Sequence, residues 1–319
     1  MKKILCVLMS CLLFVMAGCS GHSKNLKFGA ADIGGVYYSM ASTFTQLADK
    51  EIDGYTFETK TTAGSVANLR LISDGYIDLA IVQADLLSDA YNATGTFTDK
   101  KYQKGYKAVA SLYTECCQIV VRKDSGITGI DDLINKTVSV GASESGSEKN
   151  AEQILKMSGI TDELINKVNM DYTEAAEKLK AGEIDAFFCT AGTRTEVIGQ
   201  LSKECDICLI SLDDKCIDKM LSAYSLCEKY TIPAGTYNGQ DSDVTTIGVK
   251  AVLIAKQSLS DDVIKNVTKT IYEHADDFKY ATSLDISFDI NTAADGVDIP
   301  FHSGAAAYYT ERGINVLTE

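Results

Sequence analysis

The sequence of 319 residues has no tryptophan, three histidines and only two prolines. Three histidines leave little material for histidine-based catalysis. The two prolines, Pro233 and Pro300, form no proline-rich linker, so the parts of the chain are expected to be closely connected. Basic residues are also scarce, with 30 Lys and Arg against 44 Asp and Glu and a formal net charge of −14. Such a surface repels phosphate backbones, which excludes nucleic acid as a partner, and it argues against attachment to anionic lipid by charge alone.

Sequence motifs of nucleotide-binding and hydrolytic enzymes are absent as well. The chain contains no G-x-x-x-x-G-K-[ST] and no G-x-G-x-x-G, and it has neither G-x-S-x-G nor H-E-x-x-H. We therefore expect no catalytic residues and no cofactor. Hydrophobic residues make up 45% of the chain and charged residues 23%, which is ordinary for a globular protein, and the length suits about two domains.

The N-terminus is typical of a signal peptide. Lys2 and Lys3 precede a short apolar run, residues 4–17, which is too short to span a bilayer comfortably. Cys19 directly follows a small-residue site, as in the lipobox of bacterial lipoproteins. We expect residues 1–18 to be removed, Cys19 to be lipidated and residues 19–25 to form a tether. An ordinary secretory signal with a chance cysteine is the alternative. Either way the protein is expected outside the cytoplasm, and with a lipid on Cys19 it is anchored to the membrane.

Strand and helix patterns alternate along the rest of the chain. Gly75 is placed to stop the second predicted helix. This alternation predicts an α/β fold with a largely parallel sheet. The expected strands are 26–30, 55–61 and 77–82, and the expected helices are 36–50, 65–74 and 261–278.

An internal echo indicates two similar lobes. Residues 68–83 and 176–190 both contain a helical segment, a glycine, one further residue, Ile-Asp and an apolar strand. Two long apolar stretches, 108–122 and 245–255, are each long enough to pass from one lobe to the other. A chance echo is the alternative. The expected division is lobe 1 from residues 26–115 and 247–319, and lobe 2 from residues 116–246.

Three loops carry glycine together with serine or threonine at predicted helix starts. They are residues 32–38, 61–65 and 143–147. A helix N-terminus offers unpaired N–H groups and partial positive charge, which suits a carboxylate or phosphate. Each loop alone is equally well explained as a helix cap. If both lobes are doubly wound, however, the three loops converge on one cleft.

Seven cysteines remain in the mature chain beside Cys19. The Cys205-x-x-Cys208 spacing invites a zinc or redox interpretation, with two further cysteines as candidate ligands, but it matches no zinc module and we expect no metal. An odd count excludes complete pairing, and a bridge between two adjacent cysteines is strained. An enzyme that uses Cys117 or Cys189 in the cleft stays an alternative. The seven are Cys116, Cys117, Cys189, Cys205, Cys208, Cys216 and Cys227.

Six ordered motifs resemble the TAXI-type solute-binding proteins of tripartite ATP-independent periplasmic (TRAP) transporters. The similarity runs from residue 26 to residue 313. The motifs are Gly-Gly-Val-Tyr-Tyr at 34–38, Gly-Ser-Val-Ala-Asn-Leu at 64–69, a Gly-x-x-Asp-Leu-Ala-x-Val-Gln strand at 75–83, Leu-Tyr at 112–113, Val-Gly-x-x-x-Ser-Gly at 140–146 and Pro-Phe-His-x-Gly-Ala at 300–305.

The resemblance implies a monomeric protein with a two-lobed periplasmic-binding-protein (type II) fold. Each lobe would be a mostly parallel sheet flanked by helices. The lobes would close on a small organic anion, of the glutamate and amino-acid, 2-oxoacid or dicarboxylate class, and deliver it to TRAP integral-membrane subunits that use an ion gradient. A ligand receptor for a sensor kinase is the alternative partner. The predicted ligand-binding residues are Gly35, Tyr37, Ser65, Asn68, Gln83, Tyr113, Ser145, Gly146, Ser147 and Thr193.

Three charged residues depart from the family pattern. Asp32 stands where the family usually has a small Thr-Gly loop, and it could repel a carboxylate or hold an amino group. Glu144 occupies a position that is usually neutral. Arg194 replaces part of a His-Pro pair and is either a partner for a carboxylate or a solvated surface residue. These departures concern the choice of ligand more than the fold.

Overall fold

The computed structural model describes residues 23–99, 105–284 and 288–319. The predicted signal peptide, the lipidation site at Cys19 and part of the predicted tether lie outside these residues. Within the described ranges, no helix has both the length and the apolar character needed to cross a membrane.

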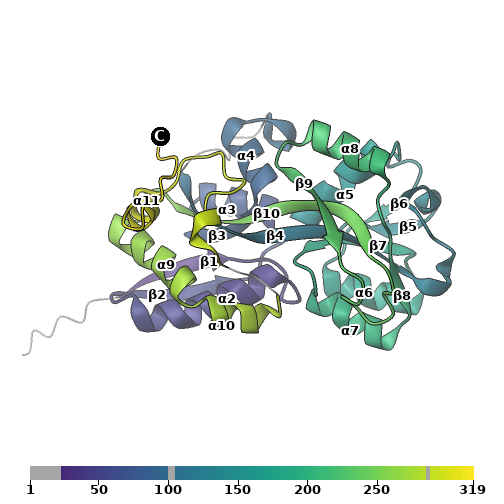
Figure 1. The fold of residues 1–319 in the computed structure, drawn as a ribbon, viewed down its shortest axis with the longest axis horizontal. Helices are drawn as coiled ribbons and strands as arrows, with labels where there is room; N and C mark the ends of the chain where they lie inside the picture. Colours follow the sequence, from purple (N-terminus) through teal and green to yellow (C-terminus); the bar gives the residue numbers. More distant parts are fainter. Residues whose placement is uncertain (1–22, 100–104, 285–287) are drawn as a thin grey trace, which may run out of the picture.

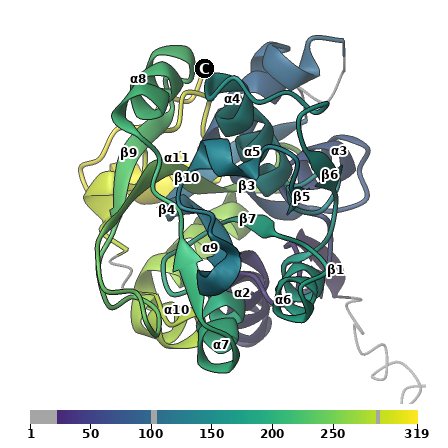
Figure 2. The ribbon, with the colours of Figure 1, turned by 90° about the vertical axis from the view of Figure 1, so that its right-hand side faces the viewer.

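One continuous sheet runs through the molecule in the order β2-β1-β3-β10-β4-β7-β5-β6, with β8 beside β4 and β9 beside β10. Helices cover both faces of the sheet (Figures 1 and 2). The strands are β1 Lys24–Gly29, β2 Tyr55–Lys60, β3 Leu79–Gln83, β4 Tyr106–Arg122, β5 Thr137–Ser139, β6 Asn166–Val168, β7 Ala186–Ala191, β8 Ile207–Leu209, β9 Cys227–Ile232 and β10 Val244–Lys256.

The two ends of the sheet repeat one pairing scheme, which confirms the two-lobed α/β fold. In the first lobe β1 pairs in parallel with β2 and β3, and β3 pairs antiparallel with β10. In the second lobe β5 pairs in parallel with β6 and β7, and β7 pairs antiparallel with β4. We use "first lobe" for β1–β3 with the helices of residues 36–92 and 261–310, and "second lobe" for β5–β9 with the helices of residues 146–223.

Strands β4 and β10 connect the lobes and run side by side through the middle of Figure 1. The C-terminal part of β10 pairs with β3, whereas its N-terminal part pairs with β9 of the second lobe. Both strands are almost entirely buried, as their long apolar stretches lead one to expect. The lobe boundaries at residues 115 and 247 stay a prediction, and both fall inside these crossing strands.

The helices that flank the sheet place apolar residues at helical spacing against it. In α2, for example, Met40, Phe44 and Ala48 are buried on one side. The helices are α2 Val36–Glu51, α3 Ser65–Ser73, α4 Ala84–Asn92, α5 Gly146–Met157, α6 Tyr172–Ala181, α7 Glu196–Glu204, α8 Asp214–Ala223, α9 Asp261–Glu273, α10 Ala275–Thr282 and α11 Ser303–Thr310.

The sequence echo corresponds to two equivalent helix–strand units, α3–β3 and α6–β7. Gly75 follows α3 and Gly182 follows α6, with φ angles of 83° and 74°. This left-handed conformation strains residues that have a Cβ atom, which explains why glycine ends both helices.

The prediction of one closing helix over residues 261–278 is wrong, because the chain breaks at His274 between α9 and α10. The His274 ring lies 2.6 Å from a Glu51 carboxylate oxygen of α2 and 2.9 Å from a carboxylate oxygen of Asp277. These contacts hold His274 outside helical geometry, at φ −114° and ψ 29°, and a second short helix follows.

Candidate functional site

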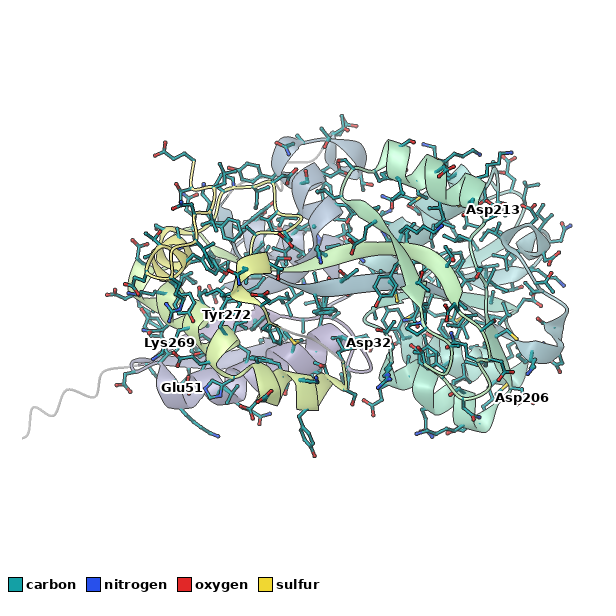
Figure 3. The ribbon with its side chains drawn as sticks, in the orientation of Figure 1. Asp32, Glu51, Asp206, Asp213, Lys269 and Tyr272 are labelled. Carbon is teal, nitrogen blue, oxygen red and sulfur yellow. The ribbon has the colours of Figure 1, made fainter. Side chains whose placement is uncertain are left out.

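A partly enclosed cavity of about 40 Å³ lies between the two lobes, beside the crossing strands. A water molecule needs roughly 10–15 Å³ by this kind of measure, so the space holds a few water-sized groups. In Figure 3, Asp32 marks the place, since it lies between the left and right halves of the molecule. The lining residues are Ala31, Asp32, Gly35, Val36, Tyr37, Ala63, Gly64, Ser65, Gln83, Glu115, Ala142, Ser145, Gly146, Ser147, Asp171, Tyr172, Thr190 and Ala191.

Five helices begin at this cavity, three from the first lobe and two from the second. The first N–H groups of a helix have no partner within it and carry partial positive charge, so they suit a carboxylate or another anionic group. α3 and α5 start close together, because a Cβ atom built on Gly64 would lie 3.4 Å from Ser145 Cα. The residues that precede α2, α3, α4, α5 and α6 all line the cavity, and they are Gly35, Gly64, Gln83, Ser145 and Asp171.

Glu115 brings a buried carboxyl group to the same cavity from strand β4. It is 3% exposed. The Tyr37 hydroxyl donates to its Oε2 at 3.0 Å, and the Tyr113 hydroxyl donates to its Oε1 at 3.5 Å. Burial raises the pKa of Glu115 to about 8, even though hydrogen bonds from Tyr37 and Gln83 act in the opposite direction.

Asp32 and Asp171 bring two further carboxyl groups to the cavity, one from each lobe. Burial raises the pKa of Asp32, and the nearby charge of Asp171 raises it further. Among the described residues that line the cavity, none is a lysine, arginine or histidine. The helix N-termini of the cavity therefore suit a negative group, and its carboxyl groups, which have no basic partner in the lining, suit a positive one.

Seven of the predicted ligand-binding residues line this cavity. Their hydroxyl groups, however, mostly hold the protein together. Ser145 Oγ accepts from Glu148 N at 3.0 Å and caps α5, and Ser147 Oγ accepts from Thr190 N at 2.8 Å. Ser65 Oγ accepts from Gln83 N at 3.1 Å. The seven are Gly35, Tyr37, Ser65, Gln83, Ser145, Gly146 and Ser147.

Asn68, Tyr113 and Thr193 lie outside the lining. The Asn68 side-chain amide donates to the carbonyls of Ala30 at 2.6 Å and Ile81 at 2.9 Å, so it ties α3 to the sheet instead of reading a ligand. Tyr113 lies behind Glu115 and donates to it. Thr193 Oγ1 faces the Tyr230 hydroxyl at 3.4 Å.

Sequence reasoning missed Glu115, Asp171, Tyr172 and Thr190. Glu115 was recognisable as a single acidic residue within a long apolar stretch, which must be buried once that stretch becomes a central strand. Asp171 and Glu174 form an N-cap signal, and Asp171 Oδ1 does accept from Glu174 N at 2.8 Å. The Tyr172 hydroxyl donates to the Thr190 carbonyl at 3.0 Å and lies 2.5 Å from Ser147 Oγ, and neither contact has a sequence signal.

The three departures from the family pattern occupy different places. Asp32 lines the cavity, and Arg194 is exposed outside it. Glu144 pairs across the lobes with Arg70 of α3, through contacts of 2.6 and 3.1 Å between the guanidinium and the carboxylate. The Glu144 carbonyl also accepts from Ala67 N at 3.1 Å. Glu144 thus joins the lobes at the edge of the cavity.

No cysteine is among the described residues that line the cavity. All seven cysteines of the described chain are free thiols. Burial raises the pKa of Cys117 to about 12 and that of Cys189 well above its usual range, which leaves both thiols protonated and unreactive. In the described ranges, no three His, Cys, Asp or Glu side chains are grouped so as to hold a metal ion.

The profile of the NMT1-like family matches residues 28–313, which include every element of both lobes except the first residues of β1.

Three solved structures share the fold. PhnD1 from Prochlorococcus marinus, in complex with methylphosphonate, is 13% identical with a TM-score of 0.54, over 78% of this chain and 84% of PhnD1. An ancestral arginine-binding protein bound to arginine is 15% identical with a TM-score of 0.51, over 82% and 99% of the two chains. XAC2383 from Xanthomonas citri, bound to ATP, is 12% identical with a TM-score of 0.51, over 81% and 87%.

Proposed function

This chain belongs to the NMT1-like family, and we propose that it is an extracytoplasmic solute receptor. Its two lobes close on a small solute that carries a carboxylate, and no reaction follows. The convergence of five helix N-termini from both lobes on one small cavity carries this proposal. Two structures of the same fold hold small solutes, methylphosphonate in one and arginine in the other.

The carboxylate lies at the starts of α3 and α5, next to Ser65 and Gly146. An organic anion of the amino-acid, 2-oxoacid or dicarboxylate class meets this requirement. Contacts to both lobes favour the closed arrangement, because a ligand shifts a conformational equilibrium by its difference in affinity for the two states. The absence of cysteine and histidine from the described lining supports a binding role over the alternative of a cysteine enzyme.

Delivery to TRAP-type membrane subunits is part of the proposal and rests on the six motifs that resemble TAXI proteins. The chain would be held at the membrane by a lipid on Cys19 and act as a monomer with the lobe division given above. Reconstitution with those subunits tests the partner: solute uptake should follow an imposed ion gradient and should not need ATP. ATP-dependent uptake, or none while the solute still binds, contradicts TRAP delivery.

A thermal-shift screen of residues 20–319 tests the receptor role. The panel contains amino acids, 2-oxoacids, C4 dicarboxylates, simple sugars, phosphate and zinc. A solute at 100 times its Kd adds about 2.7 kcal/mol of stability, which shifts the melting temperature by several degrees. We expect a shift with at least one class of carboxylate solute and none with sugars or zinc. A response to zinc alone contradicts the proposal and returns attention to the cysteines.

A further inference from the structure

The acidic groups of the cavity narrow the chemical class of the solute further than the helix N-termini do. An anion needs only the N-termini. Three carboxyl groups in the lining face no basic side chain among the described lining residues, so a second carboxylate on the solute would find no cationic partner there. Three carboxyl groups in a ligand site indicate that the solute itself carries a group that binds them.

Gln83 provides an independent observation. It is 1% exposed, and its Nε2 donates to Asn150 Oδ1 of the second lobe at 3.0 Å. Its Oε1 is buried and has no hydrogen-bond partner in the described structure, although Gln83 lines the cavity. A buried acceptor left unpaired costs about 1–3 kcal/mol, so this oxygen calls for a donor on the solute. Asp32 Oδ2 is likewise buried and without a partner.

The Glu115 carboxyl group has a fixed position at the same cavity. Tyr37 and Tyr113 donate to its two oxygens and so fix the carboxyl group at the cavity wall. The Glu115 carboxyl group, an amide oxygen and the carboxyl groups of Asp32 and Asp171 therefore face one small space. A protonated amino group has three donors and one positive charge, and it satisfies this set where a keto or carboxylate group cannot.

We propose that the solute carries a protonated amino group and has no net negative charge. Glu115 and the Gln83 Oε1 atom hold the amino group, and Asp32 and Asp171 exclude solutes with acidic side chains. The solute is thus a neutral or basic amino acid, and 2-oxoacids, dicarboxylates and glutamate are excluded. This inference rests on the proposed receptor function and narrows its substrate class.

Calorimetric titration with matched solutes tests the inference. Alanine is compared with pyruvate and glutamine with glutamate, since each pair differs mainly in the amino group or in one acidic group; arginine, 2-oxoglutarate and succinate complete the panel. We expect binding only among alanine, glutamine and arginine. In E115Q the best of these should bind at least tenfold more weakly. E273Q makes the same chemical change on the exposed side of α9 and should leave affinity unchanged.

The outcomes separate the two proposals. If a 2-oxoacid, a dicarboxylate or glutamate binds as tightly as the amino acids without net negative charge, the inference is overturned while the receptor function stands. Unchanged affinity in E115Q also overturns the inference. If no compound in either class binds, the receptor function as stated fails and the inference fails with it.

Discussion

Burial of Glu115 predicts a specific dependence of stability on pH. Its pKa is raised to about 8 in the folded protein, against an ordinary value of 4.5. Between these values the folded state keeps a proton that the unfolded state has lost. The free energy of unfolding therefore falls as pH rises, by about 1.4 kcal/mol per pH unit. The loss from this one group reaches about 3 kcal/mol at pH 7 and levels off near 5 kcal/mol above pH 8.

Glu115→Gln removes the titration and keeps one oxygen that accepts from one of the two tyrosines, while the new amide nitrogen faces the hydroxyl of the other. The variant should become progressively more stable than the wild type from pH 5 to pH 8. Asp85, whose pKa burial raises to about 6, contributes with the same sign, but it is present in both proteins and cancels in the comparison.

Urea unfolding at pH 5, 6, 7 and 8 measures this difference. Far-ultraviolet circular dichroism is the suitable probe, because the chain has no tryptophan to report by fluorescence. E273Q serves as the matched control and should follow the wild type at every pH. A difference between E115Q and wild type that stays constant within about 0.5 kcal/mol across this range would refute the reasoning.

Three further predictions follow from the packing. Gly304→Ala should destabilise the protein by about 1–3 kcal/mol in urea unfolding, because its Cβ would lie 2.2 Å from a backbone oxygen of α9, whereas Gly199→Ala, with open space around it, should not. Asn68→Ala should cost about 2–4 kcal/mol, since it leaves buried carbonyls unpaired, and a loss below 1 kcal/mol contradicts its structural role. Arg70→Met breaks the pair with Glu144, which is worth about 0.5–1 kcal/mol, and should raise the radius of gyration of the solute-free protein in X-ray scattering; an unchanged value means that the pair does not hold the lobes together.

Much of the fold follows from local patterns in the sequence. The long apolar stretches become β4 and β10, and Gly75 and Gly182 end equivalent helices, because burial and left-handed backbone each leave a residue-level signal. The break at His274 had no such signal. It depends on Glu51, which is far away in sequence and comes close only after α9 packs on α2.

Only the part of the candidate site that is built from helix starts could be predicted from the sequence. Glycine and serine at helix starts pointed to Ser65, Ser145 and Gly146, since a cap is a local feature. The acidic groups of the site depend instead on how the strands pair and how the two lobes meet. Glu115 faces the cavity because β4 passes between the lobes there, and Asp171 reaches it only when the second lobe lies against the first. Pairing across the sheet, and not periodicity, decides such positions.

The shared strands also determine how the molecule comes apart. Each lobe completes its sheet with parts of β4 and β10 that continue into the other lobe, so no uninterrupted stretch of sequence encodes a self-sufficient half. Heating should therefore give one cooperative calorimetric transition, not two. A protein fragment that ends within β4 or β10 would expose an unpaired strand edge where the missing strand had been bound. Such an edge is prone to pair with another molecule.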